Sequence, residues 1–123
     1  MYTLDTNAII YYLKGDQRVV SILDVLIKSE LPLYVSTISE VELFGFPGLT
    51  QEENEAINQL LTTVAIISLD SRVARVAGSL RRQYGVKIPD SVIAATALIT
   101  HTTLVTRNVK DFKNIVNLNL KVI

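Results

Sequence analysis

The sequence predicts an α/β fold in which helices cover a mostly parallel sheet. Short runs of β-branched and aromatic residues alternate with longer segments that carry apolar residues at helical spacing. Helices separate the predicted strands, which is typical of parallel strands joined by right-handed crossovers. Of the 123 residues, 49% are hydrophobic and 20% are charged, which suffices for one globular domain.

The first half of the chain begins with a short strand and a short helix that Gly15 can end in a left-handed conformation. Asp16 can then cap a second helix. A second strand and a third helix follow. The strands are expected at about 2–4 and 33–36 and the first and third helices at about 7–13 and 38–44, while the second helix follows Asp16 and carries Val19, Val20, Leu23, Leu26 and Ile27 at helical spacing.

The second half starts with a helix that Thr50 and Glu53 open as a capping box. The third strand, 64–68, is apolar enough to be buried on both faces. Gly85 ends the next helix, and Pro89 starts a mostly apolar one. The remaining elements are helices at 71–84 and 89–99, a fourth strand at 103–106, a turn or short helix at 108–112, and an edge strand at 118–123.

Polar side chains from distant segments are expected to meet at one edge of this sheet. In a parallel sheet all strands end at the same edge, and the crossover helices begin there. Asp5 ends the first strand, and Glu42 lies early in the helix after the second. Asp90 opens the helix before the fourth strand, and Asn108 and Asp111 follow that strand.

Such a cluster of carboxylates favours a bound divalent cation, since unpaired carboxylates repel one another and raise each other's pKa. The chain has no cysteine, and its single histidine, His101, is expected at the opposite edge of the sheet. Oxygen ligands alone indicate Mg²⁺ or Mn²⁺ rather than zinc. Sites of this kind hydrolyse phosphodiesters by activating water and stabilising charge on the leaving oxygen.

Composition and sequence pattern also bear on whether the chain is a membrane, secreted or nucleic-acid-binding protein. No apolar run approaches the roughly 20 residues of a membrane span, and Asp5 interrupts the position of a signal peptide. The absence of cysteine fits a cytoplasmic protein. Twelve basic residues balance twelve acidic ones, so nucleic-acid binding would need a local basic patch.

Four segments of the sequence resemble the PIN-domain family, specifically the VapC-type ribonuclease toxins of bacterial and archaeal toxin–antitoxin pairs. They occur in the family's order: LDTN at 4–7, STISEVEL at 36–43, PDSVIAA at 89–95 and LVTRNVKDF at 104–112. The resemblance implies a single PIN domain over 1–123, a three-layer α/β/α sandwich with a central five-stranded sheet. It also implies RNA cleavage dependent on Mg²⁺ or Mn²⁺, a homodimer, and inhibition by a cognate antitoxin protein.

By position, Asp5, Glu42 and Asp90 match the family's metal-binding acids. Many relatives have aspartate where this chain has Asn108, which offers a carbonyl oxygen but no charge. Either Asn108 or Asp111 completes the site, with one metal ion or two.

Other residues of the motifs are expected to support these acids or the substrate. Thr6 and Thr106 resemble hydroxyls that orient the acids or their waters, and Asn7 supports the Asp5 loop in the same way. Arg107 and Lys110 are expected to bind RNA phosphates because they lie near the acids in the sequence.

Each acid also has a structural interpretation. Asp5 could cap the first helix, and Glu42 could pair with Ser39 in a capping box. Asp90 lies in a first helical turn, where the helix dipole favours acids, and Asp111 could be a solvated turn residue. Considered jointly with the resemblance, Asp5, Glu42 and Asp90 favour the metal interpretation.

Two other functions compete with a nuclease. A haloacid-dehalogenase-like phosphatase also has an aspartate after its first strand, but it needs a second acid where this chain has Asn7. A non-catalytic PIN-like module that binds RNA or a protein is the other alternative. The retention of all three strong acids argues against it, because a site without catalysis does not need clustered charge.

Overall fold

The computed structural model describes residues 1–123 and has a five-stranded, all-parallel sheet at its centre. The strand order is β3-β2-β1-β4-β5, with β1 in the middle. Tyr2 of β1 pairs with Leu33 of β2 on one side and with Thr103 of β4 on the other. The strands are β1 (Tyr2–Leu4), β2 (Leu33–Ser36), β3 (Ala65–Ile67), β4 (Thr103–Thr106) and β5 (Leu120–Val122).

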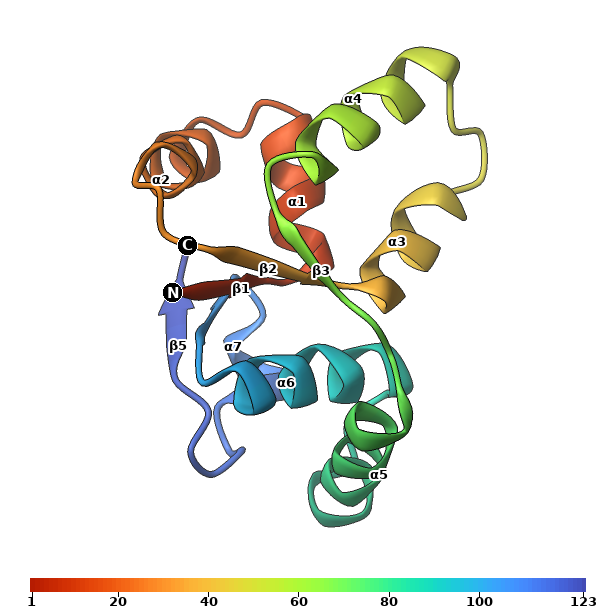
Figure 1. Ribbon diagram of the computed structural model, residues 1–123, viewed down its shortest axis with the longest axis vertical. Coiled ribbons are helices and arrows are strands. Elements are labelled where there is room, and N and C mark those ends of the chain that lie inside the picture. The colour runs from red at the N-terminus through yellow and green to blue at the C-terminus, as the bar shows by residue number, and fades with distance from the viewer.

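Helices cover both faces of the sheet, which confirms the predicted α/β architecture (Figure 1). One core joins the sheet to α1 (Thr6–Leu13), α2 (Gln17–Lys28), α3 (Thr37–Phe44) and α4 (Gln51–Leu61). The other core joins it to α5 (Ser71–Tyr84), α6 (Ile88–Thr100) and α7 (Val109–Phe112).

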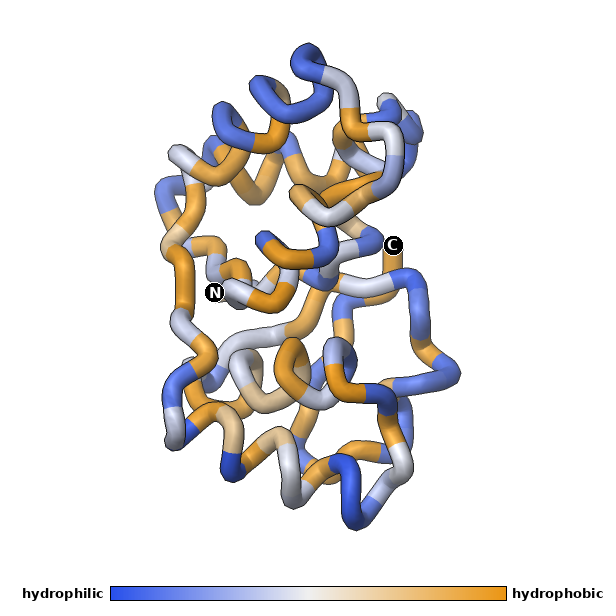
Figure 2. The backbone as a smooth tube through the Cα atoms, turned by 90° about the vertical axis from the view of Figure 1, so that its right-hand side faces the viewer, coloured by the Kyte–Doolittle hydropathy of each residue, from blue (hydrophilic) through white to orange (hydrophobic).

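Alternation along the strands supplies side chains to both cores. Leu104 belongs to the second core and its neighbour Val105 to the first, because successive residues of a strand point to opposite faces. Figure 2 shows hydrophobic residues running through the interior segments and hydrophilic residues on the outer turns. Helix α6 is buried along most of its length, from Ser91 to Ala97.

The ends of several helices follow from local chemistry. Thr50 and Glu53 form the predicted capping box at the start of α4. Asp16 caps α2 by accepting a hydrogen bond from the Val19 amide. Gly85 ends α5 with φ +68°, a left-handed conformation that favours glycine.

The third strand differs from its prediction. We expected 64–68 to be buried on both faces, but β3 is an edge strand in which Ala65 and Ile66 are exposed. An apolar, β-branched run indicates a strand but does not show whether another element covers it. No helix of the protein is both long enough and apolar enough to cross a lipid bilayer.

Candidate active site

The site lies where the strand order reverses. From β1 the chain moves outward through β2 to β3, and it then returns to β4 on the other side of β1. Open α/β sheets bind their ligands at the carboxyl ends of the strands at such a switch point. Asp5 follows β1 at this position, and its backbone amide bonds the Val105 carbonyl of β4 at 3.1 Å.

Asp5 is a buried carboxylate that is held by the neighbouring strand. Asp5 is only 3% exposed, and the Thr106 hydroxyl donates a hydrogen bond to its Oδ2 at 2.7 Å. Burial raises the pKa of Asp5 and the nearby Glu42 raises it further, while Thr106 and the amides of Asn7 and Thr6 lower it. Asp5 occupies the N-cap position of α1 without forming a side-chain capping hydrogen bond. The hydroxyl of Thr106 is therefore the side-chain contact that holds this acid in place.

Glu42 is tied to α1 through a chain of hydroxyls. The Thr6 hydroxyl donates to Glu42 Oε1 at 2.7 Å and also lies 2.7 Å from the Ser39 hydroxyl. Since a threonine hydroxyl has one hydrogen, Ser39 must donate to Thr6, and Thr6 to Glu42. Ser39 and Glu42 are three residues apart on one face of α3, which is the sequence signal that would have found Ser39.

The alternative capping role of Glu42 is wrong. Helix α3 begins one residue earlier than predicted, at Thr37, and Ser36 is its N-cap, accepting from the Ile38 amide at 3.1 Å. Ser39 therefore lies inside the helix, where it cannot open a capping box.

Asp90 lies in the first turn of α6, is half-buried, and forms no hydrogen bond through its side chain. Burial raises its pKa to about 6, helped by the charges of Asp5, Asp111 and Glu42, whereas Lys87 lowers it. A carboxylate governed by the helix dipole would have a lowered pKa instead. The acids from four separate segments thus act on one another across this edge.

Asn108 and Asp111, the two candidates for the fourth position of the site, are joined to each other by a hydrogen bond. The Asn108 side-chain amide donates to Asp111 Oδ2 at 2.7 Å, and the Asn108 backbone amide donates to the Thr106 hydroxyl at 2.9 Å. Thr106 in turn donates to Asp5. The short helix α7 is therefore connected to the carboxylate at the end of β1.

The three remaining residues of the predicted site, Asn7, Lys110 and Arg107, do not share one environment. Asn7 is exposed, and its side chain forms no hydrogen bond. Lys110 lines the same pocket as Asp90 and Asp111. The Arg107 guanidinium contacts Asp16 at 3.2 Å and lies 4.3 Å from the centre of the Tyr11 ring.

The donor set fits a hard divalent cation, because the ligands are oxygens and the carboxylates disfavour each other's charge. No group of three or more acidic or histidine side chains is arranged here so that it could hold one ion. The Thr106 hydrogen bond engages Oδ2 of Asp5, and no other side chain donates to this carboxylate.

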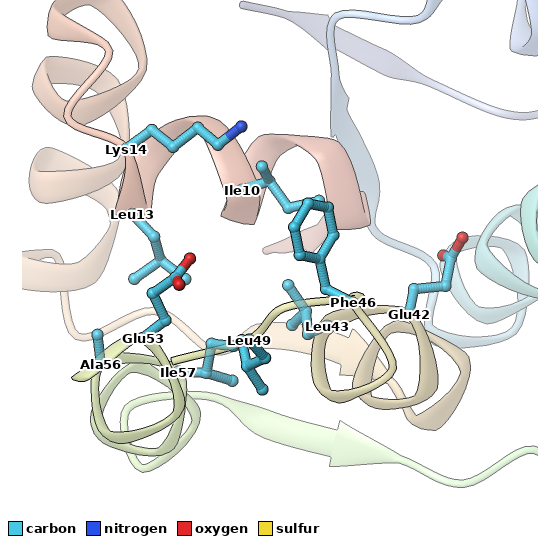
Figure 3. Close-up of a pocket in the computed structure, with 10 residues that line it drawn as sticks. All are labelled: Ile10, Leu13, Lys14, Glu42, Leu43, Phe46, Leu49, Glu53, Ala56 and Ile57. Carbon is cyan, nitrogen blue, oxygen red and sulfur yellow. The ribbon is translucent and has the colours of Figure 1, made fainter. Parts of the chain in front are cut away.

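Two hollows border the acids. A polar pocket of about 400 Å³ lies beside Asp90 and Asp111. A smaller apolar pocket of about 100 Å³ lies between α1, α3 and α4, with Glu42 at its rim. In Figure 3, Ile10, Leu43 and Phe46 line this apolar pocket, while the Glu42 carboxylate points away from it.

Known proteins of one family are similar to this chain. A family model described as PIN domain matches residues 2–118. Ribonuclease VapC2 of Rickettsia felis is 32% identical in an alignment 130 residues long, gaps included, which spans 98% of this chain and 96% of that protein. Ribonuclease VapC19 of Mycobacterium tuberculosis is 28% identical over 117 residues, spanning 91% and 92%.

Solved structures show the same fold. VapBC2 from Rickettsia felis, bound to a DNA fragment from its promoter, has a TM-score of 0.84 and 27% identity, covering 99% of this chain and 98% of that one. A toxin–antitoxin complex from Klebsiella pneumoniae has a TM-score of 0.80 and 28% identity, covering 96% and 95%.

Proposed function

The chain belongs to the PIN-domain family, among the VapC-type ribonuclease toxins, and on that premise we propose that it hydrolyses RNA phosphodiester bonds with Mg²⁺ or Mn²⁺. The observation that supports this most is the meeting of Asp5, Glu42, Asp90 and Asp111 at the switch point, close enough for the other three acids to raise the pKa of Asp90. Clustered carboxylates that form no ion pair with a lysine or arginine suit a cation better than they suit an anionic or neutral ligand.

Asp5, Glu42, Asp90 and Asn108 would hold the cation. Bound there, it would polarise a water molecule for attack on phosphorus and offset the charge on the leaving oxygen. Thr106 holds Asp5 by donating to one of its oxygens. Thr6, the first residue of α1, donates to one oxygen of Glu42 in the same manner, and Ser39 in turn donates to Thr6.

The protein's own residues also determine how the substrate approaches. Bare carboxylates repel a phosphodiester, so RNA enters only when the negative charge of the site is neutralised. Asn108 orients Asp111 through its side-chain amide, and Asp111 adds to the field around Asp90. Asp111 can therefore position charge at the site without contacting the substrate.

RNA cleavage with Mg²⁺, with Mn²⁺ and with EDTA tests the proposal directly. Wild type is compared with Asp5→Asn and Asp90→Asn, and with Glu30→Gln, which changes an exposed acid that precedes β2 at the opposite edge. We expect the two site variants to lose more than the roughly 10- to 100-fold that outer-shell residues of metal sites contribute. Glu30→Gln should cleave as wild type does. Equal RNA loss in all four proteins, or none with either metal, would exclude the nuclease.

A cognate antitoxin is the proposed protein partner, and the apolar pocket between α1, α3 and α4 is its proposed contact. Two of the solved relatives are VapBC or toxin–antitoxin complexes. Phe46, which lines the pocket, is 52% exposed, as expected of an aromatic anchor for a partner. Phe46→Ala should weaken antitoxin binding without changing RNA cleavage by the free toxin.

The proposed homodimer would use the β3 edge. Val41 is 66% exposed, Ile66 37% and Leu69 41%. Several exposed apolar residues on one part of the surface are typical of a protein interface. The Leu69 amide bonds the Thr37 hydroxyl at 3.0 Å, so the end of β3 lies against the face of α3 that carries Val41 one turn later. Sedimentation of Ile66→Lys beside wild type tests this contact, and an unchanged mass would exclude it.

A further inference from the structure

The polar pocket beside Asp90 and Asp111 has two walls from separate parts of the chain. One wall is the last turn of α5, which carries Gln83, and the turn that leads to α6, which carries Lys87. The other wall is α7 and the segment after it, which carries Lys110 and Asn114. The pocket has a volume of about 400 Å³, within the range that small-molecule and cofactor sites occupy.

Both walls are held in place by hydrogen bonds. Arg81 donates from Nη1 to the Val86 carbonyl at 3.0 Å, which closes the turn around Gly85. The Tyr84 hydroxyl accepts from the Val116 amide at 3.2 Å, which joins the two walls to each other. The pocket is therefore a fixed feature of the fold rather than a gap between loose loops.

The lysines on the two walls have no partner within the protein. Arg107–Asp16 is the only ion pair, and neither Lys87 nor Lys110 donates a side-chain hydrogen bond. Both ammonium groups line a pocket that also contains two carboxylates, yet neither pairs with them. Lysine is a compact charge that binds phosphate oxygens well, and unpaired lysines on facing walls are suited to one phosphate group.

We propose that Lys87 and Lys110 bind the phosphate of an RNA nucleotide next to the bond that is cut, so that the polar pocket is a substrate subsite. This inference depends on the proposed function, since it takes the acids at the pocket's edge as the cleavage site. A cation on those acids offsets part of their negative charge, so that Lys87 and Lys110 can attract the phosphodiester chain. The lining is mostly polar, which disfavours an apolar peptide as the occupant.

Salt-dependent binding of single-stranded RNA tests the subsite. Fluorescence anisotropy of an end-labelled RNA oligonucleotide is measured over a series of KCl concentrations, with Asp5 kept in every variant and with Ca²⁺ in place of Mg²⁺, so that the acids stay neutralised while cleavage is suppressed. Lys87→Ala and Lys110→Ala should each reduce the slope of log K against log salt, and the double variant should reduce it by about 0.7, the value for one phosphate contact on a single strand. Lys113→Ala is the matched control, because Lys113 is exposed and close to α7 but does not line the pocket.

Steady-state cleavage by proteins that retain Asp5 separates this proposal from the proposed function. Lys87→Ala should raise KM several-fold with kcat nearly unchanged, and Lys87→Arg should restore most of the binding. If wild type cleaves RNA but both alanine variants behave like Lys113→Ala, the subsite is wrong and the nuclease stands. If wild type binds RNA with the predicted lysine dependence but does not cleave it, the subsite stands and the nuclease is wrong. Loss of antitoxin affinity in the lysine variants, with RNA binding unchanged, would assign the pocket to an acidic peptide and overturn the proposal.

Discussion

The Thr106 hydroxyl donates a 2.7 Å hydrogen bond to Oδ2 of Asp5, which joins the ends of two strands that are 101 positions apart in the sequence. The same hydroxyl accepts from the Asn108 amide at 2.9 Å, and Asn108 bonds Asp111 at 2.7 Å. One oxygen atom of Thr106 therefore links β1, β4 and α7. The positions of the acids depend on this link as much as on the strands themselves.

Thr106→Val keeps the shape of this buried residue and removes the hydroxyl. Asp5 Oδ2 and the Asn108 amide then lose a partner, and an unsatisfied buried polar group costs about 1–3 kcal/mol. We expect the free energy of unfolding to fall by that amount and RNA cleavage to fall with it. Urea denaturation followed by circular dichroism, beside a cleavage assay, measures both. Thr106→Ser should restore both, and a valine variant equal to wild type would contradict the role of this hydroxyl.

The raised pKa of Asp90 makes the stability of the metal-free protein depend on pH. The folded pKa is about 6 and the ordinary value is 3.8, so the folded protein holds this proton more tightly than the unfolded chain. The resulting stabilisation is complete below about pH 4 and is lost as the pH rises through about 6. The asparagine side chain in the Asp90→Asn variant cannot ionise, so this variant does not lose stability in that way as the pH rises.

We therefore expect the melting temperature of Asp90→Asn, relative to wild type, to rise between pH 4 and pH 7 in EDTA. Differential scanning fluorimetry over that pH range measures it, and Glu30→Gln is the control for removing an exposed acid away from the site. A difference that is constant with pH would mean that the neighbouring acids do not act on Asp90.

Mg²⁺ should offset the repulsion among the carboxylates in wild type and so raise its melting temperature. A ligand that binds only the folded state raises its melting temperature, and protons compete with a cation for carboxylates. The increase caused by Mg²⁺ should therefore be larger at pH 7 than at pH 5. Asp5→Asn and Asp90→Asn should show little increase at either pH, and an equal increase in all three proteins would show that the cation binds elsewhere.

Local chemistry explains why some of these features are predictable from sequence and others are not. The capping box of Thr50 and Glu53 and the left-handed Gly85 are signals contained within a few residues, and both are confirmed. The gathering of the acids follows from parallel topology, since every strand of such a sheet ends at the same edge. The exposure of β3 depends on which elements pack over it, and a run of apolar residues carries no information about that.

Long-range side-chain contacts are the least predictable part of the site. The link from Ser39 through Thr6 to Glu42 depends on which face of α3 meets α1, and the sequence pattern leaves that face undefined. Arg107 is a second example. Its position next to Asn108 in the sequence suggested RNA binding, but its guanidinium contacts Asp16, which is 91 positions away.

Substitution of Arg107 separates a structural role from RNA binding. Its guanidinium donates to Asp16 and to the Ile123 carbonyl and stacks on the Tyr11 ring, so Arg107→Lys keeps the charge but loses the planar fork and most of the stacking. We expect a lower melting temperature and an unchanged salt dependence of RNA binding, the opposite of Lys110→Ala.

Asp16→Asn is the matched partner variant, because asparagine still caps α2 while its charge is lost. Asp16→Asn should lower the melting temperature, and the double variant should fall by less than the sum of the two single changes, because both remove the same ion pair. A smaller salt slope in Arg107→Lys with an unchanged melting temperature would assign Arg107 to the RNA instead.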